Sequence, residues 1–127
     1  MDNMERLEQI VARLPDAVRV DIAAWDDEPT FRVNGKNFVF SDQGAHSLSM
    51  KLPKDEAAAV VAEDLRVEPT GYGLGRHGWV SLSLEDDADD ERWRQVEEWV
   101  RTSYTLVAPR RLARRVMDED AVLRDAD

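Results

Sequence analysis

Cysteine is missing from this 127-residue chain. Its absence excludes a disulfide framework, a thiolate metal site and a cysteine nucleophile, and it fits a reducing compartment. The sequence also has no run apolar enough to span a bilayer or to act as a signal peptide, because residues 1–14 are charged and follow a helical pattern. We therefore expect a cytoplasmic protein with no membrane partner.

Positive charge is scarce, since 17 Lys and Arg residues face 27 Asp and Glu residues and the formal net charge is −10. Phosphate backbones repel an acidic protein unless a local basic patch outweighs the mean field. The length is that of one domain, which buries roughly two thirds of its unfolded surface. We expect a monomer with a single domain over residues 1–117 and an acidic, frayed tail over residues 118–127.

The residue patterns of catalytic and cofactor sites are also absent. His46 and His77 are the only histidines, and nothing beside them marks the partners of a catalytic triad or a zinc site. The glycines of residues 71–75 lead into a strand and lack a following Lys-Ser/Thr, so they do not predict a phosphate cradle. The aspartates of residues 86–90 lack the glycine and glutamate of a calcium loop. The sequence therefore predicts a protein that is not an enzyme and holds no metal or cofactor.

The stretch from Thr30 to Leu52 predicts an antiparallel meander of three strands. Its first turn is Asn34-Gly35, the dipeptide favoured in type I′ hairpins, and its second is Asp42-Gln43-Gly44. Alternation places Val39 on the outer face of the second strand. The same alternation assigns one set of side chains to the core, namely Phe31, Val33, Phe38, Phe40, His46, Leu48, Met50 and Leu52.

Further helices and strands flank the meander. Apolar residues at spacings of three and four predict helices over residues 4–14, 53–65, 93–104 and 109–116. Leu65 belongs to the apolar face of the second of these. Alternation predicts strands over residues 18–24, 66–68 and 79–84, with Val18, Val20 and Ile22 facing inward. Together these patterns predict an α+β fold in which an antiparallel sheet carries its helices mainly on one face.

The outer face of the predicted sheet is unusual, because it carries two tryptophans among serines and cations. By alternation it holds Arg19, Asp21, Trp25, Arg32, Ser47, Ser49, Lys51, Trp79, Ser81 and Ser83. Exposed aromatic side chains with basic neighbours can stack on bases or anchor a protein partner. Alternatively, a terminal helix covers this face or a bulge turns a tryptophan inward. The arginines between Arg110 and Arg115 form either a binding patch or a solvated helix face paired with the acidic tail.

Several motifs follow one another along the chain: the segment Phe31 to Phe38, then Leu48-Ser49-Met50-Lys51-Leu52, Gly78-Trp79-Val80, Ser103-Tyr104 and the closing basic helix. In this order and spacing they resemble the MmcQ/YjbR family over about residues 3 to 116. The resemblance implies a compact α+β fold like that of the bacterial frataxin homologues such as CyaY. It also implies a double-wing arrangement of hairpins that is proposed to bind DNA.

Carried over residue by residue, the resemblance implies DNA contacts from Lys36 at the first hairpin tip, from Lys51, and from Arg76 with His77. Ser103 and Tyr104 match a Ser-Tyr step, to which we assign a packing role. One departure is the pair Tyr72-Gly73, which stands where family members often carry a histidine.

We therefore expect a small binding domain with duplex DNA as its partner. The alternative is a protein-interaction module that uses Trp25 and Trp79 on the outer sheet face, and the net negative charge favours it. A third hypothesis, suggested by the likeness to frataxin, is metal handling through Asp2, Glu5 and Glu8 on the first helix.

Overall fold

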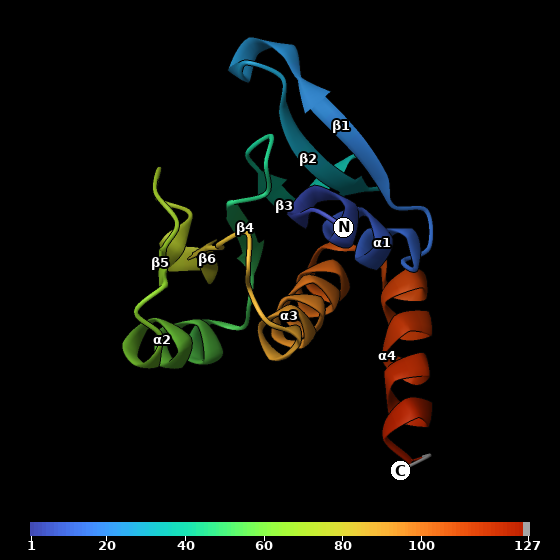
Figure 1. Ribbon diagram of the computed structural model, residues 1–127. Coiled ribbons are helices and arrows are strands. Elements are labelled where there is room, and N and C mark those ends of the chain that lie inside the picture. The colour runs from blue at the N-terminus through green and yellow to red at the C-terminus, as the bar shows by residue number, and fades with distance from the viewer. Residues whose placement is uncertain (126–127) are drawn as a thin grey trace.

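A six-stranded sheet forms the centre of the computed structural model, which describes residues 1–125 (Figure 1). All neighbouring strands are antiparallel, and the order β1-β2-β3-β4-β6-β5 leaves β1 and β5 at the edges. The strands are β1 (Val18–Ile22), β2 (Glu28–Val33), β3 (Lys36–Ser41), β4 (Ser47–Lys51), β5 (Val67–Pro69) and β6 (Trp79–Ser83). The predicted meander is confirmed as the middle of this wider sheet.

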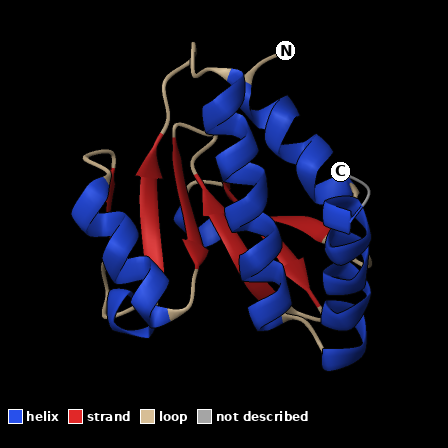
Figure 2. Ribbon diagram, turned by 90° about the horizontal axis from the view of Figure 1, so that it is seen from below, coloured by secondary structure: helices blue, strands red, loops and turns tan. Residues whose placement is uncertain are grey.

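Helices cover one face of the sheet, and Figure 2 shows them in front of the strands. They are α1 (Asn3–Ala12), α2 (Lys54–Glu63), α3 (Asp90–Val107) and α4 (Arg110–Asp125), with short 3-10 turns η1 (Ala23–Trp25) and η2 (Gly75–His77) in the connections. The predicted α+β class is therefore confirmed. Within residues 1–125, no helix is both long enough and apolar enough to cross a membrane.

Two helix boundaries differ from the prediction. The helix α2 ends at Glu63, and Leu65 is fully exposed in the connection to β5 instead of lying on an apolar helix face. The expected frayed tail is wrong for residues 118–125, because α4 continues through them to Asp125. Its middle is tied to α3, where Arg101 forms an ion pair with Asp120 at 2.7 Å. Residues 126 and 127 lie outside the described part of the chain.

The first hairpin turn forms as the sequence predicts. Asn34 and Gly35 both have positive φ, 52° and 77°, as a type I′ turn requires. The ladder between β2 and β3 then pairs Val33 with Lys36 and Arg32 with Asn37. The turn therefore projects Lys36, which is exposed at the start of β3, from the end of the sheet.

A bulge in β3 overturns the predicted faces of that strand. Phe31 pairs with Val39 but Arg32 pairs with Asn37, so Phe38 is an extra residue in β3. Both Phe38 and Val39 are completely buried. Phe38 packs edge-on against Tyr104 of α3, with ring centroids 5.4 Å apart. The prediction that Phe40 shares a face with Phe38 is wrong, because after the bulge Phe40 lies on the outer face.

The edge strand β1 also faces the opposite way from the prediction. Arg19 pairs with the buried Phe31, so its side chain lies on the helix-covered side, where it forms ion pairs with Glu8 of α1 and with Asp21. The hydrogen bond of Asp21 raises the pKa of Arg19 further above its ordinary value. Val18 and Val20 consequently turn to the outer face, and Val18 is 54% exposed. Alternation gave the period of this strand correctly but assigned its two faces in reverse.

A buried hydroxyl group joins α3 to the sheet beside the bulge. The ladder between β3 and β4 pairs Val39 with Met50 but is not continued to Lys51. Instead, the Lys51 backbone N–H donates to Ser103 Oγ at 2.9 Å, and Ser103 Oγ donates to the Phe38 carbonyl at 2.7 Å. The next residue, Tyr104, donates its hydroxyl to the Pro15 carbonyl at 2.7 Å. Burial raises the pKa of Tyr104 above its ordinary value, which keeps this donor protonated.

Replacement of Ser103 by alanine tests this junction. The change leaves a buried N–H and a buried carbonyl without partners, and we expect it to lower the free energy of unfolding by about 1–3 kcal/mol. Urea denaturation followed by circular dichroism measures the difference.

The matched control is Thr105→Ala on the same helix, whose hydroxyl bonds only the Thr102 carbonyl one turn earlier. We expect this change to cost less than about 0.5 kcal/mol. Equal effects of the two substitutions would contradict the bridging role of Ser103.

Candidate functional site

Cationic side chains from separate elements meet at one end of the sheet, which we call the basic end. Lys36 opens β3, Lys51 closes β4, and Arg76 and His77 form η2 just before β6. Because β4 runs antiparallel to both β3 and β6, these positions lie at the same end. Lys54, which opens α2 only three residues after Lys51, lies there as well. The structure therefore brings together the four residues that the resemblance selected.

The loop that carries Arg76 and His77 is held directly against the end of β4. Lys51 pairs with Trp79, and the Leu52 backbone N–H donates to the Gly78 carbonyl at 2.9 Å. Gly78 has a φ of 93°, and a Cβ at this position would lie 2.1 Å from the Leu52 carbonyl oxygen. Only glycine fits this close approach. It fixes η2 beside Lys51, about 10 Å or two strand intervals across the sheet from β3.

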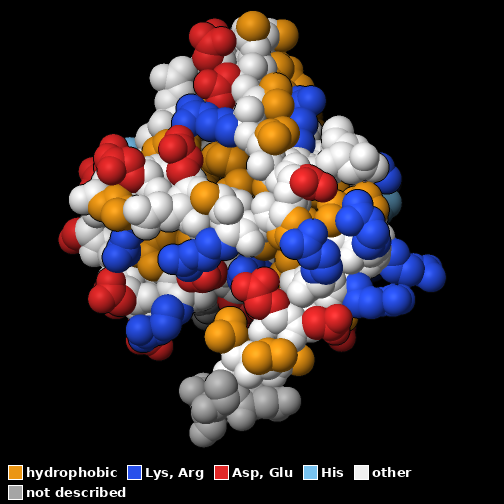
Figure 3. All heavy atoms as spheres, turned by 90° about the vertical axis from the view of Figure 1, so that its right-hand side faces the viewer, with side chains coloured by type: hydrophobic (Ala, Val, Ile, Leu, Met, Phe, Trp, Pro, Cys, Tyr) orange, Lys and Arg blue, Asp and Glu red, His pale blue; other side chains and the backbone are white. Residues whose placement is uncertain are grey.

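The cations of the basic end are available for an external partner. Among the residues that the structure describes, no ion pair engages Lys36, Lys51, Lys54 or Arg76. Lys36, Lys54, Arg76 and His77 are exposed, and Lys51 is half-buried. Figure 3 faces the neighbouring side of the molecule, which carries α4, and shows further Lys and Arg side chains gathered there.

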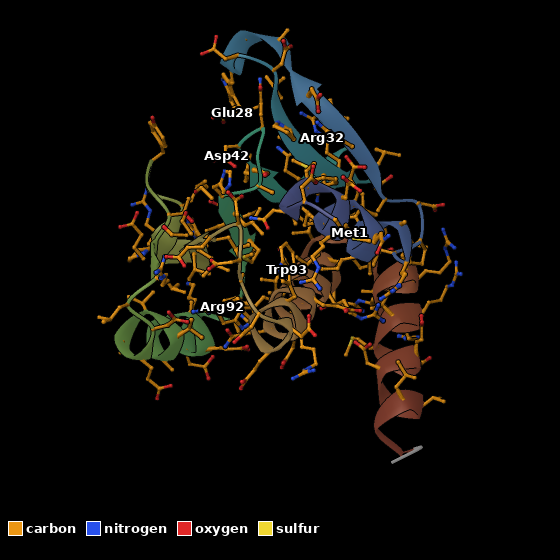
Figure 4. The ribbon with its side chains drawn as sticks, viewed as in Figure 1. Met1, Glu28, Arg32, Asp42, Arg92 and Trp93 are labelled. Atoms are coloured by element: carbon orange, nitrogen blue, oxygen red, sulfur yellow. The ribbon has the colours of Figure 1, made fainter. Side chains whose placement is uncertain are left out.

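Carboxylates gather at the opposite end of the same sheet, which we call the acidic end. Figure 4 shows Glu28 and Asp42 there, on β2 and on the turn after β3. The connection from β6 to α3 adds Glu85, Asp86, Asp87, Asp89 and Asp90. Asn3 ties these loops together, because its side-chain amide donates to the carbonyls of Ala45 and Glu85 at 3.2 Å each. The net charge of the chain is thus unevenly distributed along the strands.

Ion pairs fasten the acidic end to its surroundings. Figure 4 shows Arg92 and Trp93, adjacent side chains of α3. Arg92 forms an ion pair with Asp64 at 2.6 Å, and the Arg6 guanidinium lies over Trp93, 5.3 Å from the ring centroid. The Arg92 hydrogen bond lowers the pKa of Asp64 below its ordinary value. These arginines are therefore engaged within the protein, in contrast to the cations of the basic end.

His46 belongs to the acidic end. Its backbone N–H donates to the Asp42 carboxylate at 2.7 Å, and its ring Nε2 lies 2.6 Å from Asp86 Oδ1. The hydrogen bond with Asp86 raises the pKa of His46 above its ordinary value of 6.5. The side chain is half exposed, so the prediction of an inward-facing position on β4 is wrong. His46 precedes β4 and closes a contact between two loops.

The outer face of the sheet carries the two tryptophans of the alternative hypothesis, in unequal environments. Trp25 in η1 is 51% exposed, whereas Trp79 in β6 is only 8% exposed. Phe40 lies between them, with ring centroids 6.5 Å from Trp25 and 5.3 Å from Trp79. Ser49 and Ser81 are hydrogen-bonded beside this aromatic row at 2.7 Å. Trp79 therefore supports the row, and Trp25 is the tryptophan that a partner could reach.

The acidic residues considered for metal handling have other roles. Asp2 is the N-cap of α1, since its carboxylate accepts the Glu5 backbone N–H at 2.8 Å. Glu8 forms an ion pair with Arg19. The described residues contain no group of three or more Asp, Glu or His side chains placed to hold a metal ion.

The chain is similar to known proteins in sequence pattern and in fold. A family model described as YjbR matches residues 12–106, which is more than half of the chain. Among solved structures, the chain is similar to protein DR2400 of Deinococcus radiodurans, which carries the domain DUF419. The TM-score is 0.71 at 20% identity, over 91% of this chain and 88% of that chain, so this likeness shows the fold alone. No curated protein matches the chain.

The contact between His46 and Asp86 predicts a pH-dependent contribution to stability. Because the pKa of His46 is raised in the folded state, the contribution is full below the unfolded pKa and disappears as the pH rises through the folded pKa. We expect Asp86→Asn to lower the melting temperature more at pH 5.5 than at pH 8.5, as measured by thermal denaturation. The control Asp87→Asn removes the same charge from a neighbouring exposed position, and a similar pH dependence for both variants would contradict the assignment.

Proposed function

The chain belongs to the YjbR family, and on this basis we propose that it is a non-enzymatic domain that binds duplex DNA through its basic end. In this proposal Lys36, Lys51 and Arg76 contact phosphates, and His77 contributes a further polar contact beside Arg76. The hairpin tip at Asn34-Gly35 projects Lys36 toward a groove, as a wing would. Phosphate contacts position a protein on DNA without selecting a sequence.

The observation that carries the proposal is the grouping of unpaired cations at one end of the sheet. The strands β3 and β4 contain six and five residues, so the acidic end lies roughly 17–20 Å away. The Debye length is only about 8–10 Å at physiological ionic strength. The carboxylates of the far end are therefore largely screened from a duplex that touches Lys36 and Arg76, in spite of the negative total charge.

The salt dependence of DNA binding tests this proposal. Three phosphate contacts predict a slope of about −2.7 in a plot of log K against log salt concentration. Neutralisation of one contact, as in Lys36→Gln or Arg76→Gln, should reduce the slope by about one and weaken binding to any sequence equally. Fluorescence anisotropy with a random duplex at low salt measures both quantities.

Arg94→Gln is the matched control, because Arg94 is exposed on α3, forms no ion pair among the described residues and lies outside the basic end. It should leave the slope unchanged. Absence of binding at tens of micromolar protein, where nonspecific binders register, would refute the proposal. An equal loss in Arg94→Gln would refute the assignment to the basic end.

A protein partner on the outer sheet face is the second candidate function. It is supported by the uncovered position of this face, which lies behind the strands in Figure 2, away from the helices. Trp25 and Val18 are more than half exposed on it. Half-exposed tryptophans of this kind are frequent anchors in protein interfaces.

The substitution Trp25→Ala distinguishes the two candidate functions. If the outer face binds a protein, the substitution should abolish capture of that partner in a pull-down and leave DNA binding unchanged. Tyr72→Ala, which removes a fully exposed aromatic ring from the loop before η2, is the control and should retain capture. Retention of the same partner by Trp25→Ala would exclude the outer face.

A further inference from the structure

The helix α4 projects from the body of the protein beyond Asp120, the last of its described residues that is paired with α3. Leu112 and Val116 are buried against the core, at 2% and 1% exposure. Beyond them Met117, Val122 and Leu123 are each more than half exposed. Figure 1 shows the last turns of α4 projecting past the other elements, and Figure 3 shows uncovered hydrophobic side chains at this lower end. At about 100° per residue these three side chains point to different sides of α4, and Val122 is the one on the side of Arg115 and Asp118.

A shallow groove lies beside the same helix, between the end of α3 and the start of α4. Its lining consists of Thr105, Ala108, Arg110, Ala113, Arg114, Met117 and Asp118. Leu106, next to the groove on α3, is 44% exposed. Four of the nine large hydrophobic side chains that are exposed in the described residues are thus located on the last turns of α3 and on α4.

The order of charges along α4 is the opposite of the order that a helix dipole favours. Arg110, Arg111, Arg114 and Arg115 occupy its first half, no acid lies in its first turn, and Asp118, Glu119 and Asp120 follow. Helices favour acidic residues near the N-terminus and basic residues near the C-terminus, so this order disfavours an isolated helix. Within the described residues, the four arginines form no ion pair. The sequence hypothesis that the acidic tail pairs with them is therefore wrong for the described residues.

The reversed order becomes favourable beside an antiparallel copy of the same helix. We propose that α4 pairs with α4 of a second copy of this chain about a twofold axis near Met117. Arg114 and Arg115 of each copy then face Asp118 and Glu119 of the other. The two helix dipoles oppose each other, and Val122, on the same side of α4 as Arg115 and Asp118, faces the first turn of the partner's α4. A twofold interface is self-complementary, and this charge pattern has that property.

The proposal replaces the monomer expected from sequence with a weak dimer. One helix from each copy, about 24 Å long, gives a contact smaller than a standard interface, so the dissociation constant is expected to be on the order of micromolar. The dimer does not depend on DNA binding. The residues of the basic end, Lys36, Lys51 and Arg76, are not part of the contact and remain open in each copy.

Sedimentation velocity of the full chain from about 1 to 300 micromolar, a range that brackets micromolar association, tests the proposal. The wild-type protein should shift from monomer to dimer with concentration, and 0.5 M NaCl should weaken the dimer because its ion pairs are screened. A double variant, Arg114→Glu with Arg115→Glu, should remain monomeric. A second, Asp118→Arg with Glu119→Arg, should remain monomeric as well.

An equimolar mixture of the two double variants decides the geometry. In the mixed pair the new glutamates face the new arginines, and the other half of the contact keeps its native pairing, so the dimer should return. Circular dichroism of each variant verifies that α4 is folded, and Arg94→Glu serves as a charge reversal away from the contact that should leave the dimer intact. A wild-type protein that stays monomeric throughout, or folded variants whose mixture stays monomeric, would overturn the proposal.

Discussion

The hydroxyl group of Ser103 is the contact on which the arrangement of this fold depends. The bulge at Phe38 interrupts the ladder between β3 and β4, and an interrupted ladder leaves buried backbone groups that must find partners. Ser103 supplies both partners from α3, accepting from Lys51 and donating to Phe38. These two hydrogen bonds fix α3 against the middle of the sheet and hold the end of β4 against the helix. Tyr104 then packs edge-on against Phe38. The position of Lys51 in the basic end follows from this junction.

The antiparallel topology separates the charges of the chain. Every strand has one terminus at each end of the sheet, and the connections at the two ends differ in composition. The connections after β1, β3 and β6 are rich in aspartate and glutamate, whereas the other end carries Lys36, Lys51, Lys54 and Arg76, with Asp55 and Glu56 of α2 beside Lys54. A total charge computed from the sequence averages these two ends. The total charge therefore describes how the protein interacts with a distant polyanion. For a partner that lies within one Debye length, the charges near the contact decide the interaction.

Sequence patterns predicted the features that depend on local chemistry. The Asn34-Gly35 turn and the alternation of β4 depend on neighbouring residues only, and they formed as expected. The bulge was not predictable, because Phe38, Val39 and Phe40 are all apolar. A run of apolar residues has no alternation that would reveal an extra residue. The faces of β1 were reversed because this edge strand is poorly covered on either face, with Val18, Arg19 and Asp21 all exposed. For the site, family resemblance selected Lys36, Lys51, Arg76 and His77, but their meeting at one end required the strand order. Lys54 was missed because the sequence places it at the start of a helix, and nothing in the sequence shows that this helix begins beside the end of the sheet.

The two edges of the sheet limit how this protein can associate. An edge strand with free backbone groups can recruit further strands, and this is a common route to fibrous aggregates. Here β5 has only three residues and includes Pro69, which has no N–H to donate, while β1 carries the charged side chains Arg19 and Asp21 between its apolar residues. Both borders are therefore poor templates for an added strand. Concentrated solutions of the protein should resist conversion into cross-β polymers, and any partner must approach through side chains rather than by extending the sheet.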